Sequence, residues 1–260
     1  MAEGSRESRA ELARLVAEAR ALVEDLEARG ALEEPVSNEV HRAAKVEEAT
    51  ASGLNAWSAV AAEARDADVS PEVALARVRE DLGDCRRCNL AKGRKQIVFG
   101  VGAPEADLVV VGEGPGYHED QRGEPFVGPA GEMLDKMLAN VLGLPREQVY
   151  ILNVVKCRPP KNRNPLPDEV AACRPFLQGQ LDAIQPKVLL VLGSVAFRTL
   201  FDTDEGIMRN RGRWRELGGV PVMPTLHPAY LLRNPADKRL SFEDLKAVRR
   251  RYDELGGRRS

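Results

Sequence analysis

The sequence predicts an α/β protein in which four parallel strands alternate with helices. Four short apolar runs are rich in β-branched residues, which is typical of strands buried on both faces of a parallel sheet. Helical patterns lie between and after these runs, so the expected order is βαβαβαβ with a closing helix. With 260 residues, the chain is long enough to bury one core of this kind and to carry an appendage.

Each predicted element has a signal in the chain. The apolar runs place the strands at 107–112, 149–155, 187–193 and 220–227. Helical patterns lie near 130–142, 168–184, 194–200 and 241–255. Ser70 and Pro71 form an N-cap and a first-turn proline, which predicts a further helix over PEVALARVREDL. Ligands of open parallel sheets bind beyond the carboxyl ends of the strands. One crevice is therefore expected among the loops that start at Gly112, Asn153, Gly193 and His227.

Residues 1–68 form an acidic, Ala/Glu-rich segment, which we interpret as a helical or disordered appendage to a folded domain at 69–260. A helix is expected near 6–29. Residues 1–80 hold ten Lys and Arg against seventeen Asp and Glu, a net charge of −7, and the remaining residues hold 28 against 23, a net of +5. A basic body suits a phosphate backbone, although an ordinary solvated surface explains the same balance.

Cysteine spacing indicates a metal site. No run of eighteen apolar residues and no signal peptide is present, so we expect a cytoplasmic protein with reduced thiols. Cys85 and Cys88 form a Cys-x-x-Cys pair, Cys157 ends the second strand and Cys173 lies on the following helix. One close pair with two scattered thiols favours an iron-sulfur cluster. A zinc site and four unrelated buried thiols are the alternatives.

Two loops carry residues suited to chemistry. After the first strand, GEGPGYHED combines glycines that permit close approach of a ligand with acidic residues, but its spacing does not match a nucleotide-binding loop. Phe126 follows in the same loop. Taken singly, Glu119 and Asp120 could form a solvated loop edge, and Phe126 could be a core residue. The fourth strand ends in LHPAYLLRNP, where His227 precedes an apolar pair and Arg233. Such a pair can fill the gap that an extruded base leaves in DNA.

The ordered motifs GEGPGxxED, PFVGPAG, LNVVKCRPPKNRNP and HPAYLLR, together with the four cysteines, resemble the family 4 uracil-DNA glycosylases over roughly residues 73–255. The resemblance implies a three-layer α/β/α fold with a central four-stranded parallel sheet. It also implies a [4Fe-4S] cluster remote from the chemistry. The expected activity is excision of uracil from single- or double-stranded DNA by a monomer, which leaves an abasic site for base-excision repair.

The resemblance also assigns roles to single residues. Phe126 stacks on the flipped uracil, and the amide of Asn153 reads its O4 and N3 edge. His227 donates a hydrogen bond to O2, and Glu113 lies beside the sugar. The remaining assignments are Glu119, which positions water or excludes the methyl group of thymine; Gly114 in the uracil pocket; and Asn162, Leu231, Leu232 and Arg233 on DNA.

Some alternatives stay open at this point. A non-catalytic iron-sulfur protein that binds nucleic acid is one, and a family member retargeted to hypoxanthine or xanthine is another. Tyr117 and His118 occupy the variable pair of GEGPGxxED, and the resemblance assigns them no role. Neither active-site loop carries a lysine for Schiff-base chemistry, so strand cutting is not expected.

Overall fold

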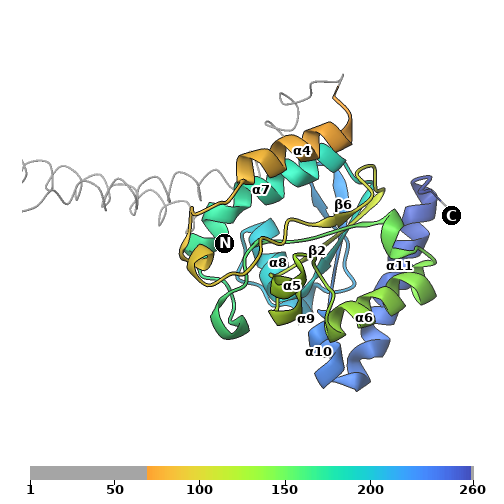
Figure 1. Cartoon of the computed structure of the whole chain (residues 1–260). Helices are drawn as coiled ribbons and strands as arrows, with labels where there is room; N and C mark the ends of the chain where they lie inside the picture. Colours follow the sequence, from red (N-terminus) through yellow and green to blue (C-terminus); the bar gives the residue numbers. More distant parts are fainter. Residues whose placement is uncertain (1–68, 259–260) are drawn as a thin grey trace, which may run out of the picture. The chain divides into compact units, whose positions relative to one another are not determined.

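The computed structural model describes residues 69–258, which form a sheet covered by helices on both faces (Figure 1). The strand order is β1-β3-β2-β4-β6-β5. The four central strands run parallel and match the four predicted runs: β2 (Leu108–Gly112), β3 (Tyr150–Asn153), β4 (Val188–Leu192) and β6 (Val220–Thr225). The predicted appendage 1–68, with its helix near 6–29, lies outside the described residues.

The prediction of a four-stranded sheet is wrong, because the sheet formed by residues 69–258 has six strands. The strand β1 (Val101–Gly102) pairs antiparallel with β3, and β5 (Arg215–Leu217) pairs antiparallel with β6. Both edge strands are short, and neither is an apolar run, so the sequence pattern does not predict them. The β5–β6 hairpin turns at Gly218 and Gly219, whose φ angles of 56° and 83° favour glycine.

Alternate residues of the central strands enter two separate cores. Val109, Val111 and Val191 pack under one layer of helices, whereas Val110 and Leu190 pack under the other. All five are fully buried. Burial on both faces is the reason for continuous apolar runs rather than an alternating pattern.

One layer contains α4 (Pro71–Leu82), α7 (Pro167–Ile184) and α8 (Gly193–Phe201), with α4 lying along α7 (Figure 1). The predicted start of α4 is confirmed, because Ser70 Oγ accepts a hydrogen bond from the backbone N–H of Val73 at 3.4 Å. No helix among residues 69–258 is long and apolar enough to cross a membrane.

The other layer contains α6 (Pro129–Met137), a π-helical turn η2 (Leu138–Leu142), α10 (Pro228–Arg233) and α11 (Lys238–Glu254). The predicted helix near 130–142 is therefore α6 together with η2. Two further short helices are α5 (Tyr117–Arg122) and α9 (Ile207–Asn210). The 3-10 turns are η1 (Asn89–Lys92), η3 (Arg146–Gln148), η4 (Pro160–Asn162) and η5 (Pro235–Asp237).

The loops at the carboxyl edge of the sheet meet as expected. Those after β2, β3 and β6 line one pocket. The loop after β4 touches the same place, since a Cβ built on Gly193 would lie 3.1 Å from His227 Cβ. The parallel order thus brings residues more than 100 positions apart to one site.

Candidate active site

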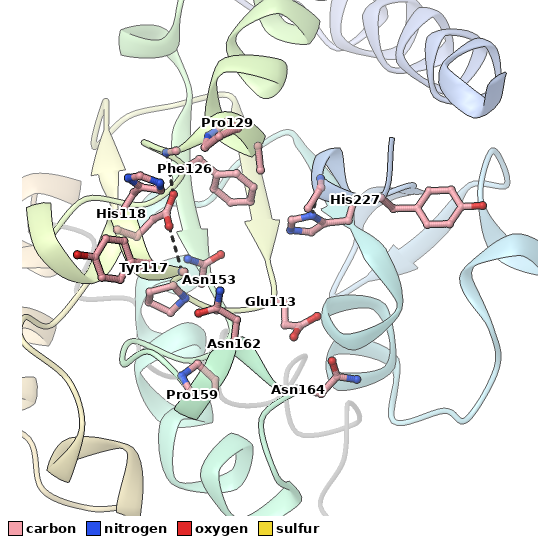
Figure 2. A pocket seen from close by; sticks show the side chains of 18 of the residues that line it. Glu113, Tyr117, His118, Phe126, Pro129, Asn153, Pro159, Asn162, Asn164 and His227 are labelled. Atoms are coloured by element: carbon pink, nitrogen blue, oxygen red, sulfur yellow. Dashed lines mark hydrogen bonds between the residues drawn. The ribbon is translucent and has the colours of Figure 1, made fainter. Parts of the chain in front are cut away.

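The pocket has a volume of about 520 Å³ and opens at the carboxyl edge of the sheet (Figure 2). Most of the residues that the sequence singled out for chemistry line it, and they come from three different loops. They are Glu113, Gly114, Glu119, Phe126, Asn153, Asn162, His227 and Arg233.

Asn153 is the last residue of β3 and is 2% exposed. Its neighbour in register is Gly112 of β2. A Cβ on Gly112 would lie 2.4 Å from Asn153 Oδ1 and 2.6 Å from Phe126 Cζ, so only glycine leaves room for both side chains. Among the described residues, Asn153 Oδ1 is buried and accepts no hydrogen bond. A buried carbonyl without a donor costs about 1–3 kcal/mol, so this atom is suited to the N–H of a ligand.

Phe126 is buried and adopts a φ of 53°, in the left-handed region that non-glycine residues rarely occupy. Gly131, in the first turn of α6, permits this conformation, because a Cβ there would overlap the Phe126 carbonyl. Arg146 Nη1 donates to the same carbonyl at 3.2 Å. The Phe126 ring lies 5.6 Å from the His227 ring at an interplanar angle of 28°. The loop thus holds a flat apolar surface in the pocket, close to the histidine.

His227 precedes α10, and its Nδ1 accepts a hydrogen bond from the backbone N–H of Ala229 at 3.1 Å. Desolvation, followed by the positive charge of Arg233, lowers the pKa of His227 to about 4, and the negative charge of Glu119 opposes part of this shift. The imidazole is therefore neutral at pH 7. Since Nδ1 accepts, the single ring proton is on Nε2. His227 is a neutral hydrogen-bond donor.

Glu119 holds two loops together. Its Oε1 accepts from the backbone N–H groups of Val127 and Gly128 at 2.9 and 3.0 Å, and its Oε2 accepts from that of Gly116 at 3.0 Å. The carboxylate is thus committed to the backbone. Next to it, Asp120 Oδ1 accepts from the backbone N–H of Lys95 at 2.7 Å. The acidic pair is therefore not the solvated loop edge that was one interpretation of the sequence.

Two further positions in the GEGPG loop limit the chemistry. Glu113 is half-buried, and desolvation raises its pKa. At Gly114, a Cβ would lie 2.7 Å from Val155 Cγ2, so a larger residue is excluded unless Val155 moves. The pocket therefore has no side chain at the Gly114 position to activate water.

The predicted DNA-contacting residues differ in exposure. Asn162 and Arg233 line the pocket and are exposed. Leu232 is 42% exposed, but Leu231 is 1% exposed and belongs to the core under α11. Neighbouring residues of a helix point about 100° apart, so the two leucines of α10 cannot share one surface. The interpretation of Leu231 as a DNA contact is corrected, because it is a core residue.

The sequence did not identify every residue that lines the pocket. Pro159, Asn164 and Tyr230 were not singled out, and Tyr117 and His118 were noted without a role. A signal existed for Asn164, which lies in the same KNRNP segment as Asn162. Tyr230 lies in the HPAYLLR motif, but the partner of its hydroxyl, Asp237 Oδ2 at 2.7 Å, is known only from the structure.

None of the four cysteines forms a disulfide. Cys85 and Cys88 are half-buried, and Cys157 and Cys173 are buried. Desolvation is the main cause that raises the pKa of Cys157 to about 11 and the pKa of Cys173, and the charge of Cys88 adds to both shifts. In residues 69–258, no three His, Cys, Asp or Glu side chains are grouped as ligands of one metal ion.

Basic groups surround the cysteines. Arg94 Nη1 lies 3.4 Å from Cys157 Sγ and donates to the Cys85 carbonyl at 2.6 Å. The backbone N–H of Lys156 lies 3.3 Å from Cys173 Sγ. Hydrogen-bond donors thus face two of the four sulfur atoms, and Arg94 opposes the desolvation that raises the pKa of Cys157.

The fold and the pocket define a class of protein, and comparison with known families identifies it. A family model for the uracil DNA glycosylase superfamily matches residues 99–249, which include all six strands. The chain is 42% identical to a type-4 uracil-DNA glycosylase of Sulfurisphaera tokodaii over 183 residues, or 67% of this chain and 83% of the relative. It is 44% identical to one of Thermotoga maritima over 178 residues, or 66% and 91%. The chain belongs to the type-4 uracil-DNA glycosylases within this superfamily.

The chain is also similar, at lower identity, to the type-5 uracil-DNA glycosylases. A type-5 uracil-DNA glycosylase of Pyrobaculum aerophilum is 34% identical over 163 residues, or 56% of this chain and 70% of the relative.

Proposed function

We propose that the protein excises uracil from DNA in base-excision repair by hydrolysing the bond between uracil and deoxyribose. The observation that carries this function is the unpaired Oδ1 of Asn153, buried beside the Phe126 ring. Uracil presents a donor at N3 and an acceptor at O4. The Asn153 amide complements both groups, with Oδ1 accepting from N3–H and the NH₂ donating to O4. Cytosine presents the reverse pattern, so the amide rejects it.

His227 and Glu113 supply the chemistry. As the bond between C1′ and N1 breaks, its electron pair moves to uracil, and negative charge builds on O2. A neutral His227 with its proton on Nε2 donates a hydrogen bond to that oxygen and needs no positive charge to do so. The Glu113 carboxylate stabilises the positive charge of the sugar. Water adds to C1′ and releases one proton, which uracil takes up.

Glu119 has a positioning role in this proposal. Its three hydrogen bonds hold Gly116 next to the segment that carries Phe126, so the carboxylate sets the width of the pocket. No other carboxylate is required to activate water, because most of the rate enhancement comes from stabilising the negative charge on the departing uracil. On the rim, Asn162, Leu232 and Arg233 contact the DNA.

We further propose that Cys85, Cys88, Cys157 and Cys173 bind a [4Fe-4S] cluster. The four thiols come from the segment after α4, the segment after β3 and helix α7, and Arg94 Nη1 and the backbone N–H of Lys156 lie 3.4 and 3.3 Å from the Cys157 and Cys173 sulfur atoms, which suits sulfur that would carry negative charge as a cluster ligand. Such a cluster would supply structure rather than chemistry, by tying the segment after α4 to the segment after β3. We also propose that residues 69–260 act as a monomer and that 1–68 take no part in excision.

The function is tested with single-turnover assays on oligonucleotides that contain one U, T, hypoxanthine or xanthine. We expect release of uracil alone, with an abasic site and no strand cut. Preferential release of hypoxanthine or xanthine would show that this base, rather than uracil, is the substrate. Release of no base by protein that binds the same DNA would show a non-catalytic binding protein.

A further inference from the structure

We propose that Tyr117, backed by Arg158, is a stacking surface for the nucleobase next to the flipped uracil in single-stranded DNA. This proposal rests on the proposed function, because it requires that the pocket take its base from a DNA strand. The occupant is a neighbouring base of the same strand, of any sequence.

The Tyr117 side chain is placed at the rim of the pocket and remains accessible. It is the first residue of α5, it lines the pocket, and it is 52% exposed. Figure 2 shows it on the side opposite His227. An aromatic ring exposed to this extent beside a nucleobase pocket offers a hydrophobic contact that the free protein leaves to water.

Two neighbours hold the ring. The Arg158 guanidinium carbon lies 5.2 Å from the centre of the Tyr117 ring, and the His118 ring lies edge-on at 5.5 Å. Arg158 is held in turn, since its Nε donates to Asn162 Oδ1 at 2.7 Å. The ring and the cation are therefore ordered before DNA binds, which reduces the entropy lost on stacking. The cation also lies where it attracts a phosphate.

The geometry favours a neighbouring base over uracil itself. Uracil has its stacking partner in Phe126, beside Asn153 and His227, and Tyr117 stands outside that group. When uracil leaves a single strand, the adjacent base loses a stacking partner. In a duplex that base stays paired with the opposite strand, and Leu232 is available to fill the gap. Stacking on an aromatic side chain depends little on base identity. The contribution of Tyr117 is therefore larger for single-stranded DNA.

The test uses oligonucleotides with 2-aminopurine on the 5′ or the 3′ side of 2′-fluoro-2′-deoxyuridine, a uridine whose glycosidic bond resists cleavage. Stacking on a ring quenches 2-aminopurine. We expect wild-type protein to quench the probe on one side, and Tyr117→Leu to abolish that quenching. On single-stranded DNA with normal deoxyuridine, Tyr117→Leu should raise KM about tenfold with a much smaller change in kcat. Tyr117→Phe should retain both properties, and the loss on duplex DNA should be smaller.

A matched control is available in α11. Phe242 is 45% exposed, and Lys246 Nζ lies 5.0 Å from its ring, but neither residue lines the pocket. Phe242→Ala should leave quenching and KM unchanged, and melting curves should show that every variant folds.

Equal KM and equal quenching for Tyr117→Leu and wild type would overturn the inference, and so would an equal loss in Phe242→Ala. Failure of the proposed function is separate, because wild-type protein would then release no uracil even if quenching through Tyr117 persisted.

Discussion

At the scale of single residues, the pocket depends on one amide. Asn153 is buried, its Oδ1 accepts no hydrogen bond among the described residues, and glycine at position 112 makes room for it. A carboxylate at position 153 accepts hydrogen bonds but donates none, so it repels O4 of uracil and suits the amine of cytosine. The base preference should therefore follow the group that faces O4, which is the NH₂ of Asn153.

We therefore expect Asn153→Asp to lower the rate of uracil excision by about 30- to 1000-fold, which corresponds to the loss of roughly 2–4 kcal/mol. Cytosine excision should become detectable. Single-turnover rates on U:G and C:G duplexes measure both effects, and a melting curve serves as the control for folding. An unchanged uracil rate in a folded variant would contradict the role of Asn153.

His227 gives a prediction about pH. Its pKa of about 4 lies below the value of about 6.5 for an unfolded chain, so the unfolded state binds the proton more readily. The neutral ring thus contributes stability that is complete above pH 6.5 and is lost as the pH falls toward 4. Between pH 6 and 8 the excision rate should show no step caused by this histidine.

Nitrogen-resolved NMR of the histidine rings measures the titration directly. The ring of His227 should stay neutral down to about pH 5. Arg233→Ala should move its pKa upward, because the variant removes the nearby positive charge. A His227 ring that titrates near pH 6.5 in the folded protein would refute the assignment.

At the scale of elements, α10 separates two adjacent leucines. Leu231 is buried in the core, and Leu232 faces solvent and precedes Arg233, which lines the pocket. Leu231→Ala should lower the free energy of unfolding by about 2–5 kcal/mol. Leu232→Ala should change it by less than about 0.5 kcal/mol.

The two variants should differ in the opposite sense toward DNA. Leu232→Ala is expected to reduce uracil excision from duplex DNA more than from single-stranded DNA, because only a duplex leaves a gap to be filled. Excision rates measured at a temperature at which both variants are fully folded test this expectation. A duplex-specific loss in Leu231→Ala alone would reverse the assignment.

At the scale of the whole molecule, the four cysteines come from distant segments of the chain. Cys85 and Cys88 follow α4, Cys157 follows β3 and Cys173 lies in α7. Protein purified without oxygen should be brown and carry about four irons per chain. Cys157→Ser should lose iron and lower the melting temperature. Iron analysis and visible absorption provide the measurement, and one zinc per chain without iron would contradict the cluster.

The boundary of the catalytic domain can be tested by truncation of the chain. Removal of residues 1–68 should leave uracil excision within about threefold of the full chain, because that segment carries no chemical cluster and its negative charge repels DNA. A truncated protein that retains its iron and its melting temperature but releases no uracil would place part of the active site in residues 1–68.

The sequence by itself determined the four central strands, the start of α4 and the residues that meet in the pocket. These follow from local rules, namely apolar runs, an N-cap, and the convergence of parallel strands at their carboxyl ends. The family resemblance rests on motifs that are also local, and it is confirmed.

Only the tertiary structure decided the rest. The edge strands β1 and β5 exist because a neighbouring strand supplies their hydrogen bonds, so their own residues carry little signal. The burial of Leu231 depends on what covers α10, and the commitment of Glu119 depends on the approach of two loops. The low pKa of His227 follows from desolvation and from Arg233. Each of these properties arises from groups brought together by folding, which is the reason that sequence patterns alone did not contain them.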